Sequence, residues 1–347
     1  MVPIFLVVDG DSSNCAEWES LLQSQGCDVI AARTGETAVA LCPKLQPDLV
    51  LLRDLLPDVH GLEVCRRLKA DPRNRLTPVI MLASSDNASL SSSAREAGAD
   101  DIWGHPPTPW EAIGRVQSLL QLKTYIDEQA ESVIFTLART IESRDPYGGG
   151  HCARVSSNAV RFGKSLGLSK ADLDTLRIGG LVHDIGKVGI LDSILSKPGP
   201  LDYEEARIIE QHTIVGEQIC APLKSFRHVL PLIRSHHERI NGTGYPDGLH
   251  GDQIPLMVRI IQIVDICDAL TSDRAYRQIL SLPSALIVLF EEAERGWLEE
   301  SLVNQYASLV IGTDCSAALL DRTKFRPPEI ARWSESNSLG SVNHRRG

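Results

Sequence analysis

Short apolar runs alternate with helix-like segments over residues 1–121, and this alternation restricts the possible fold more than any other feature. The runs IFLVV, CDVIAA, DLVLL and PVIML occupy residues 4–8, 27–32, 48–52 and 78–82. Runs this short and this apolar are typical of parallel strands that are buried on both faces. Stretches such as 12–26 and 61–71 between them have the length and composition of helices. The pattern predicts a doubly wound α/β domain, with a ligand site at the carboxyl ends of its strands.

A long segment without helix-breaking residues follows this domain. No proline or glycine occurs between Gly114 and Asp145, and apolar residues recur every three or four positions. This spacing predicts one helix over 109–145, roughly 50 Å long at about 1.5 Å per residue. We expect a homodimer through this linker helix or through the first domain, although Lys123 interrupts the apolar seam of the helix.

Residues 122–325, which include most of this helix, are predicted to form a second, all-α domain. Its helical stretches are interrupted at Gly-Pro clusters such as residues 197–200. The tail 326–347 is polar and poor in core residues, so we expect it to be disordered. The expected architecture is a doubly wound α/β domain, a linker helix and a C-terminal helical bundle.

Composition excludes several classes of protein. The chain has 347 residues, enough for two domains, and its formal net charge of −10 argues against binding of a nucleic-acid polymer. The N-terminus lacks a secretory signal, and the most apolar stretch, 254–270, is broken by Arg259 and two aspartates, so we expect no membrane span. Eight cysteines are scattered without a C-x-x-C pair. This usage indicates a cytoplasmic protein with reduced thiols.

Four motifs of the first domain resemble the receiver domain of bacterial response regulators: VVDGD, PDLVLLRDLLPDVHG, TPVIMLASS and AGADDIWGHPP, at residues 7–11, 47–61, 77–85 and 97–107. In that family an acidic pair binds Mg²⁺, an aspartate accepts a phosphoryl group, and a hydroxyl and a lysine respond to it. The resemblance places different residues at these positions here: Asp9 with Gly10, Arg53, Ala83 and His105.

These replacements remove the receiver's chemistry. The guanidinium of Arg53 stays protonated, so it can be neither a nucleophile nor a metal ligand. Asp54 cannot simply replace it, because consecutive strand residues point to opposite faces. We therefore predict a pseudo-receiver with no phosphorylation site, which serves dimerisation or partner contact. The alternative is an active receiver that uses Asp54. Arg53 would place a permanent positive charge near Asp9.

The second domain is notable for histidines and aspartates in apolar surroundings. Asp265 lies in the apolar helical run 260–270, where an unpaired buried carboxylate would cost several kcal/mol. His183 and Asp184 follow another apolar stretch. Adjacent helical residues project about 100° apart. Such a pair can therefore reach a single site only where other helices surround it, as in the metal centres of helix bundles.

Each of these residues also has a simpler interpretation when it is taken alone. His151 follows three glycines and could be a polar loop residue, and His212 could face the surface. The pair His236–His237 could be half buried, and Asp265 could pair with Arg259. Taken together, these interpretations require unrelated reasons for imidazoles and carboxylates on at least five segments.

The motif HDIGK at 183–187, followed by HHERINGTGYPDGLHGDQIP at 236–255, resembles the HD-GYP family of cyclic di-GMP phosphodiesterases. The resemblance covers about residues 130–320 and includes RDPYGGGH, SILSKPGPL and VDICDALTSDRAYR, at 144–151, 193–201 and 264–277. It implies seven metal ligands, namely His151, His183, Asp184, His212, His236, His237 and Asp265. Asp184 would bridge two metal ions.

The implied ligand set determines which metals we expect. Five imidazoles and two carboxylates suit Fe or Mn better than Mg²⁺, which prefers oxygen ligands. Some family members bind a third metal through a glutamate four residues before the first histidine. Tyr147 occupies that position here, so we expect two ions. Gly148 and Asn241 also depart from the family pattern, and both could alter loop order.

The resemblance implies hydrolysis of cyclic di-GMP by a water molecule that two metals activate. Asp184 and Lys187 would be the catalytic residues, since Lys187 follows Asp184 by one helical turn and can contact a phosphate. Substrate contacts are implied for Asp145, Lys187, Tyr245, Arg274 and Arg277. The expected product is pGpG, with further cleavage to GMP left open. The alternatives are a scaffold that binds cyclic di-GMP or GGDEF-domain proteins through the GYP loop, which contains Gly244, Tyr245 and Pro246, and hydrolysis of another nucleotide.

Overall fold

The computed structural model describes residues 2–84, 88–104, 108–144, 149–197, 199–272 and 279–311. Several residues singled out above lie outside these ranges: His105, Asp145, Tyr147, Gly148, Arg274, Arg277 and the tail 326–347. The chain divides into two compact units, Met1–Glu131 with Ala221–Ser225, and Ser132–Cys220 with Phe226–Gly347. Among the described residues, no helix combines the length and apolar character that a membrane crossing requires.

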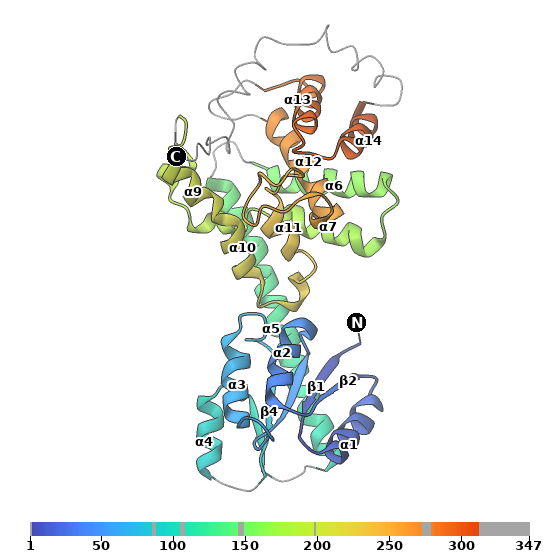
Figure 1. The fold of residues 1–347 in the computed structure, drawn as a ribbon, viewed down its shortest axis with the longest axis vertical. Coiled ribbons are helices and arrows are strands. Elements are labelled where there is room, and N and C mark those ends of the chain that lie inside the picture. Colours follow the sequence, from blue (N-terminus) through green and yellow to red (C-terminus); the bar gives the residue numbers. More distant parts are fainter. Residues whose placement is uncertain are drawn as a thin grey trace. The chain divides into compact units, whose positions relative to one another are not determined.

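The first unit contains a parallel sheet of five strands in the order β2-β1-β3-β4-β5 (Figure 1). The strands are β1 (Ile4–Val8), β2 (Asp28–Ala32), β3 (Leu49–Arg53), β4 (Val79–Leu82) and β5 (Asp101–Trp103). The helices between them are α1 (Ser12–Gln23), α2 (Gly35–Leu45), α3 (Gly61–Ala70) and α4 (Ala88–Glu96). This arrangement confirms the predicted doubly wound α/β domain. β5 has only three residues, too few to give an apolar run in the sequence.

The apolar runs are continuous because helices cover both faces of the sheet. Leu6 and Val8 of β1 pack in one core cluster with residues of α2, α3 and α4. Phe5 and Val7 of the same strand pack in a second cluster with residues of α1 and with Val116. Alternate strand residues point to opposite faces, so every position of β1 must be apolar when both faces are buried.

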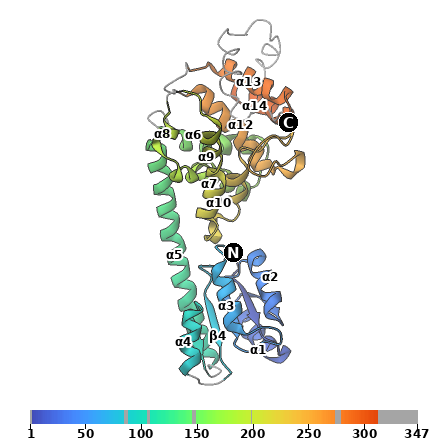
Figure 2. The same cartoon turned by 60° about the vertical axis from the view of Figure 1, so that its left-hand side comes forward.

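The predicted linker helix is present as α5 (Pro109–Arg144), a single helix of 36 residues (Figure 2). The region that follows it is helical, as predicted. Its α-helices are α6 (His151–Ser165), α7 (Lys170–Val182), α8 (Asp192–Leu195), α9 (Tyr203–Glu210), α10 (His212–Cys220), α11 (Leu230–Ser235), α12 (Leu256–Thr271), α13 (Leu282–Glu294) and α14 (Glu300–Ile311). Short 3₁₀ turns are η1 (Ile185–Gly189), η2 (Lys224–Phe226) and η3 (Gly251–Gln253).

Helix α12 lies at the centre of the second unit. Its residues Ile260, Ile261 and Val264 are fully buried in a core cluster that also includes residues of α6, α7, α13 and α14. Helices α6 and α7 approach closely, since a Cβ atom on Gly180 would lie 2.6 Å from the Cα of Ser156. Only glycine allows this approach.

Candidate metal centre

Seven imidazole and carboxylate side chains of the second unit form two groups. One group consists of Asp184, His212, His236 and His237, and the other of His151, His183 and Asp265. Within each group, one donor atom from every residue lies within 4.8 Å of the others. These are the seven residues that the HD-GYP resemblance implied as ligands, and the fold brings all of them together.

Most of these residues lie at helix ends, which is why distant segments can converge on one place. His151 begins α6 and His212 begins α10. His183 directly follows α7, and His236 directly follows α11. Asp265 alone lies within a helix, the buried α12. Adjacent pairs such as His236–His237 therefore sit where the backbone leaves the helix and is free to direct both side chains inward.

The carboxylate of Asp184 faces both groups. Its Oδ2 lies 3.5 Å from the Nε2 of His183. Its Oδ1 lies 3.4 Å from the Nε2 of His212 and 3.8 Å from the Nε2 of His236. Two oxygens directed at different sets of imidazoles are what a carboxylate shared by two cations requires.

Asp265 belongs to the histidine site and does not pair with Arg259. Its Oδ1 lies 3.2 Å from the Nε2 of His151 and 3.9 Å from the Nε2 of His183. Arg259 instead pairs with Glu299 at 2.7 Å and with Asp252 at 3.2 Å. The interpretation of Asp265 as a partner of Arg259 is therefore wrong.

Backbone contacts determine which nitrogen of each ring faces the centre. The Nδ1 atoms of His183, His212 and His236 lie 3.1, 2.6 and 3.0 Å from the carbonyl oxygens of Gly180, Ile209 and Ile233. Since a carbonyl can only accept, each Nδ1 carries the hydrogen. Each Nε2 is then the free donor that a metal ion binds, held by the hydrogen bond on the opposite side of the ring.

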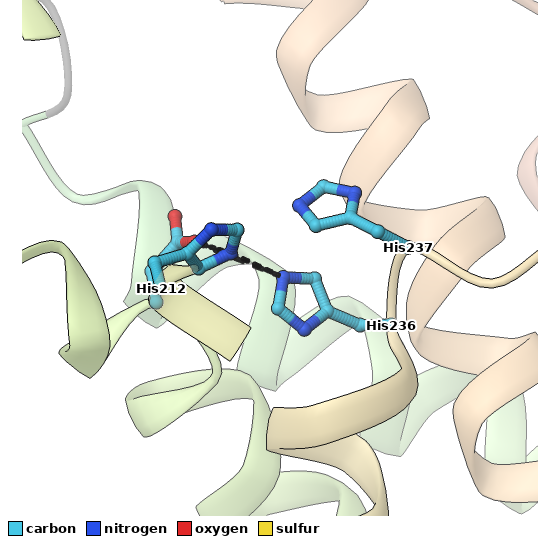
Figure 3. A group of neighbouring side chains, drawn as sticks. His212, His236 and His237 are labelled. Atoms are coloured by element: carbon cyan, nitrogen blue, oxygen red, sulfur yellow. Dashed lines mark hydrogen bonds and ion pairs between the residues drawn. The ribbon is translucent and has the colours of Figure 1, made fainter. Parts of the chain in front are cut away.

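Two of these Nε2 atoms lie unusually close together. The Nε2 atoms of His212 and His236 are 3.2 Å apart, and Figure 3 shows both rings turned toward each other, with His237 beside them. Burial lowers the pKa of His212 to about 4 and that of His236 to about 3. Both rings are thus unprotonated at neutral pH, and their lone pairs repel unless a cation lies close to both.

Two further atoms lack the partners that burial demands. The Nε2 of His183 and the Oδ1 of Asp184 are buried, and neither has a hydrogen bond within the described residues. Leaving a buried polar group unsatisfied costs about 1–3 kcal/mol. Metal ions in the two groups would satisfy both atoms. The donor set, rich in imidazole, therefore fits a pair of transition-metal ions.

The sequence reasoning missed Asp268, which holds His151 in place. The carboxylate of Asp268 is buried and lies 2.8 Å from the Nδ1 of His151. It also accepts hydrogen bonds of 2.7 and 3.0 Å from Arg154. With Nδ1 held in this way, the Nε2 of His151 faces Asp265. The sequence could have indicated this role, because Asp268 follows Asp265 by three residues and therefore shares its helix face.

The candidate substrate residue Lys187 lies beside the two groups. Its Nζ is 2.5 Å from the Oδ2 of Asp184, which places an ammonium group next to the shared carboxylate. The ring of Tyr245 stacks on that of His237, with the centroids 4.8 Å apart. The other implied substrate contacts, Asp145, Arg274 and Arg277, lie outside the described residues.

The GYP loop is held by a buried carboxylate. Glu238, which is 2% exposed, accepts hydrogen bonds of 2.7 and 2.9 Å from the backbone amides of Asp247 and Leu249. Asn241 accepts hydrogen bonds from the backbone amide and the hydroxyl of Thr243, at 3.1 and 2.7 Å. Its amide oxygen thus orders the turn, and an aspartate oxygen could accept the same two bonds.

Asp9 and Asp54 of the first unit have protein partners. The Nε of Arg53 lies 2.9 Å from the Oδ2 of Asp9, which places the arginine's positive charge beside Asp9. Asn14 donates a second hydrogen bond, of 3.0 Å, to the same oxygen. Asp54 is buried and accepts hydrogen bonds from the amide and hydroxyl of Ser84, at 3.0 and 2.6 Å.

Comparison with known proteins agrees with this architecture. The sequence profile of the HD domain matches residues 136–302, and that of the response regulator receiver domain matches residues 5–109. The chain is 34% identical to the cyclic di-GMP phosphodiesterase response regulator RpfG of Xanthomonas campestris, over 75% of each chain. It is 31% identical to a cyclic di-GMP phosphodiesterase of Thermotoga maritima, over 83% of this chain and 84% of the relative.

A third relative is named for a different substrate. The 3'3'-cGAMP-specific phosphodiesterase 3 of Vibrio cholerae is 35% identical over 61% of this chain and 43% of its own length. A receiver domain followed by an HD domain, together with the identity to full-length relatives, defines the class. The chain belongs to the HD-GYP family of response regulators, as the two sequence motifs indicated.

Proposed function

We propose that this protein is a metal-dependent phosphodiesterase that hydrolyses cyclic di-GMP to pGpG. The observation that carries the proposal is the close approach of the unprotonated His212 and His236 beside Asp184, whose second oxygen faces His183. Cations would offset the repulsion between these lone pairs and the carboxylate. The relatives named as cyclic di-GMP phosphodiesterases indicate the substrate.

The seven residues of the two groups are the proposed ligands of two ions, Fe or Mn. When bound, such ions lower the pKa of a water molecule and offset the charge that develops on a phosphate during its attack. Asp184 holds the two ligand groups together through its two oxygens. The ammonium of Lys187 lies beside Asp184. There its positive charge would offset the repulsion between the carboxylates and a non-bridging oxygen of the substrate phosphate.

Substrate recognition is proposed for residues around this centre. Tyr245 has a mostly buried ring against His237, so it can contact a base or ribose that enters beside the group of Asp184, His212, His236 and His237. Asp145, Arg274 and Arg277 keep the substrate contacts that the family resemblance implies. Cleavage of pGpG to GMP would be a second turnover at the same centre.

The defining experiment measures hydrolysis by the full chain, purified anaerobically, with Mn²⁺ or Fe²⁺. Cyclic di-GMP and 3',3'-cGAMP are tested side by side, because relatives of both named specificities match this chain. Chromatography separates pGpG from GMP. His237→Ala should lose metal and turnover, whereas the exposed His228→Ala should keep both. A chain that holds two metals per copy and cleaves neither dinucleotide would instead be a scaffold for cyclic di-GMP or GGDEF-domain proteins.

We also propose that the first domain is a pseudo-receiver. The contacts that support this are the ion pair of Arg53 with Asp9 and the two hydrogen bonds that hold Asp54. We propose residues 1–121 and 122–325 as the two domains. A cytoplasmic location is proposed, and the unpaired thiols of the described cysteines support it.

A homodimer through α5 is the proposed assembly. Six large apolar side chains on the described part of this helix are exposed, and the five other than Trp110 are exposed by 37–60% of their surface: Leu122, Tyr125, Ile126, Val133 and Leu137. Successive residues turn by about 100° around a helix, so these five share one face. Lys123 was expected to interrupt the seam, but its side chain is buried and pairs with Asp127. Pairing with the same face of a second copy would cover the stripe.

A further inference from the structure

We propose that Arg144 is a positioning residue that holds Lys187 beside the metal centre and so makes the end of α5 part of the catalytic site. The proposal rests on the proposed phosphodiesterase function. Arg144 is the last residue of α5, and its guanidinium reaches the segment that follows η1. Arg144 is not among the proposed metal ligands, catalytic residues or substrate contacts.

The guanidinium of Arg144 contacts three groups of one short segment. Its Nη2 donates a hydrogen bond of 2.7 Å to the carbonyl of Ile190, and its Nη1 donates one of 3.4 Å to the carbonyl of Lys187. Its Nε and Nη2 lie 2.8 and 2.6 Å from the same carboxylate oxygen of Asp192. The planar fork of arginine can serve all three groups at once, whereas a lysine ammonium cannot match that geometry.

The segment that Arg144 contacts carries catalytic groups. Asp184 precedes η1, and Lys187 lies within it. On its other side η1 packs directly on the start of α10, where a Cβ atom on Gly186 would clash with the carbonyl of His212. The turn η1 is therefore held between the backbone of His212, a proposed metal ligand, and Arg144 at the end of α5. Removing Arg144 frees one of these two sides.

Stability does not explain the contact. Asp192 is 72% exposed, and an ion pair that solvent reaches so readily contributes about 0–1 kcal/mol. The two carbonyl contacts, by contrast, fix where the backbone of Lys187 lies. The carbonyl of Lys187 also accepts the amide of Ile190, at 3.1 Å, so Arg144 contacts the carbonyls of both residues that this turn-closing hydrogen bond joins. Its displacement moves the ammonium of Lys187 away from Asp184.

The test compares Arg144→Ala and Arg144→Lys with a matched control. Arg177→Ala removes an arginine of the same unit that pairs with Asp174 at 3.5 Å, with both side chains about half exposed. A displacement of about 1 Å at a catalytic group can reduce rates by about 100-fold. We expect both Arg144 variants to lose about 10- to 100-fold in kcat/KM, with metal content unchanged. Arg177→Ala should match the wild type.

A double-mutant cycle then identifies the route of the effect. If Arg144 acts through Lys187, adding Arg144→Ala to Lys187→Ala should lower kcat/KM no further than Lys187→Ala alone. Additive losses, loss of metal in Arg144→Ala, or full activity in Arg144→Lys would each overturn the proposal.

Hydrogen exchange separates failure of this proposal from failure of the proposed function. Amides of residues 185–192 should exchange faster in Arg144→Ala than in the wild type, with no such change in Arg177→Ala. If the wild type cleaves no cyclic dinucleotide, the phosphodiesterase proposal fails, while exchange still reports whether Arg144 holds the turn. If the wild type is active and exchange at 185–192 is unchanged in Arg144→Ala, the positioning role of Arg144 is refuted.

Discussion

Replacing Asp268 with asparagine should remove one metal ion and leave the other. The carboxylate of Asp268 is the partner of the Nδ1 of His151 and of two nitrogens of Arg154. An asparagine keeps the shape but loses the charge, and its amide group cannot accept from all three donors. Only the ligand group of His151, His183 and Asp265 depends on this contact.

The expected loss of metal affinity can be judged from the contact of Asp268 with His151, a proposed metal ligand. Loss of a carboxylate that orients a metal-binding histidine typically lowers affinity by about 10- to 100-fold. We therefore expect Asp268→Asn to retain close to one ion per chain after dialysis against a weak chelator that leaves two in the wild type. Elemental analysis measures this stoichiometry. Asp252→Asn is the control, because Asp252 is fully exposed and only pairs with Arg259.

Two results would refute this reasoning. If Asp268→Asn keeps both ions with unchanged affinity, the contact with His151 does not orient a ligand. If it loses both ions and its thermal unfolding temperature falls together with them, Asp268 supports the fold and not one ligand group. Loss of a single ion with an unchanged unfolding temperature is the outcome that the geometry requires.

The remaining predictions concern pH, phosphorylation and assembly. The metal-free protein should lose stability as pH falls from 6.5 to 5, because the unfolded histidines take up protons there, whereas burial holds the pKa of His212 near 4 and that of His236 near 3. Thermal unfolding at both pH values checks this, with a loss of about 2 kcal/mol expected for each histidine. Acetyl phosphate should leave activity unchanged, since Arg53 occupies the acceptor position, and a base-labile phosphate on Asp54 that alters turnover would contradict this. Val133→Asp should dissociate the dimer in light scattering, whereas Thr124→Asp, which adds the same charge about 180° around α5 from Val133 at another exposed position, should not.

The fold could be predicted where the hydrophobic pattern is long. Four apolar runs gave four strands. In the central strands β1, β3 and β4, burial on both faces removes every polar position, whereas β2 is a partly exposed edge strand. The segment 109–145 gave α5 because it has no proline after Pro109, its first residue, and only one early glycine. β5 was not predicted as a strand, since three residues carry no periodicity.

The ligands could be predicted because their chemistry is concentrated in motifs, but the groups that orient them are ordinary residues. His183 and Asp184 stand out in an apolar stretch, whereas Asp268 and Glu238 do not differ in type from many surface carboxylates. Their roles depend on contacts with His151 and with the GYP loop, which only the folded chain brings together.

The metal-binding histidines also differ from one another in the groups that orient their rings. The Nδ1 atoms of His183, His212 and His236 each donate to the backbone carbonyl three residues earlier in the chain, so local sequence is enough to orient those rings. His151 begins α6 after Gly150, and its Nδ1 instead meets Asp268, more than a hundred residues away along the chain. The rings of His183, His212 and His236 are therefore oriented by local backbone, whereas the ring of His151 depends on α6 and α12 being packed together. The ion held by His151 should for this reason be the first to be lost when the helical unit loosens.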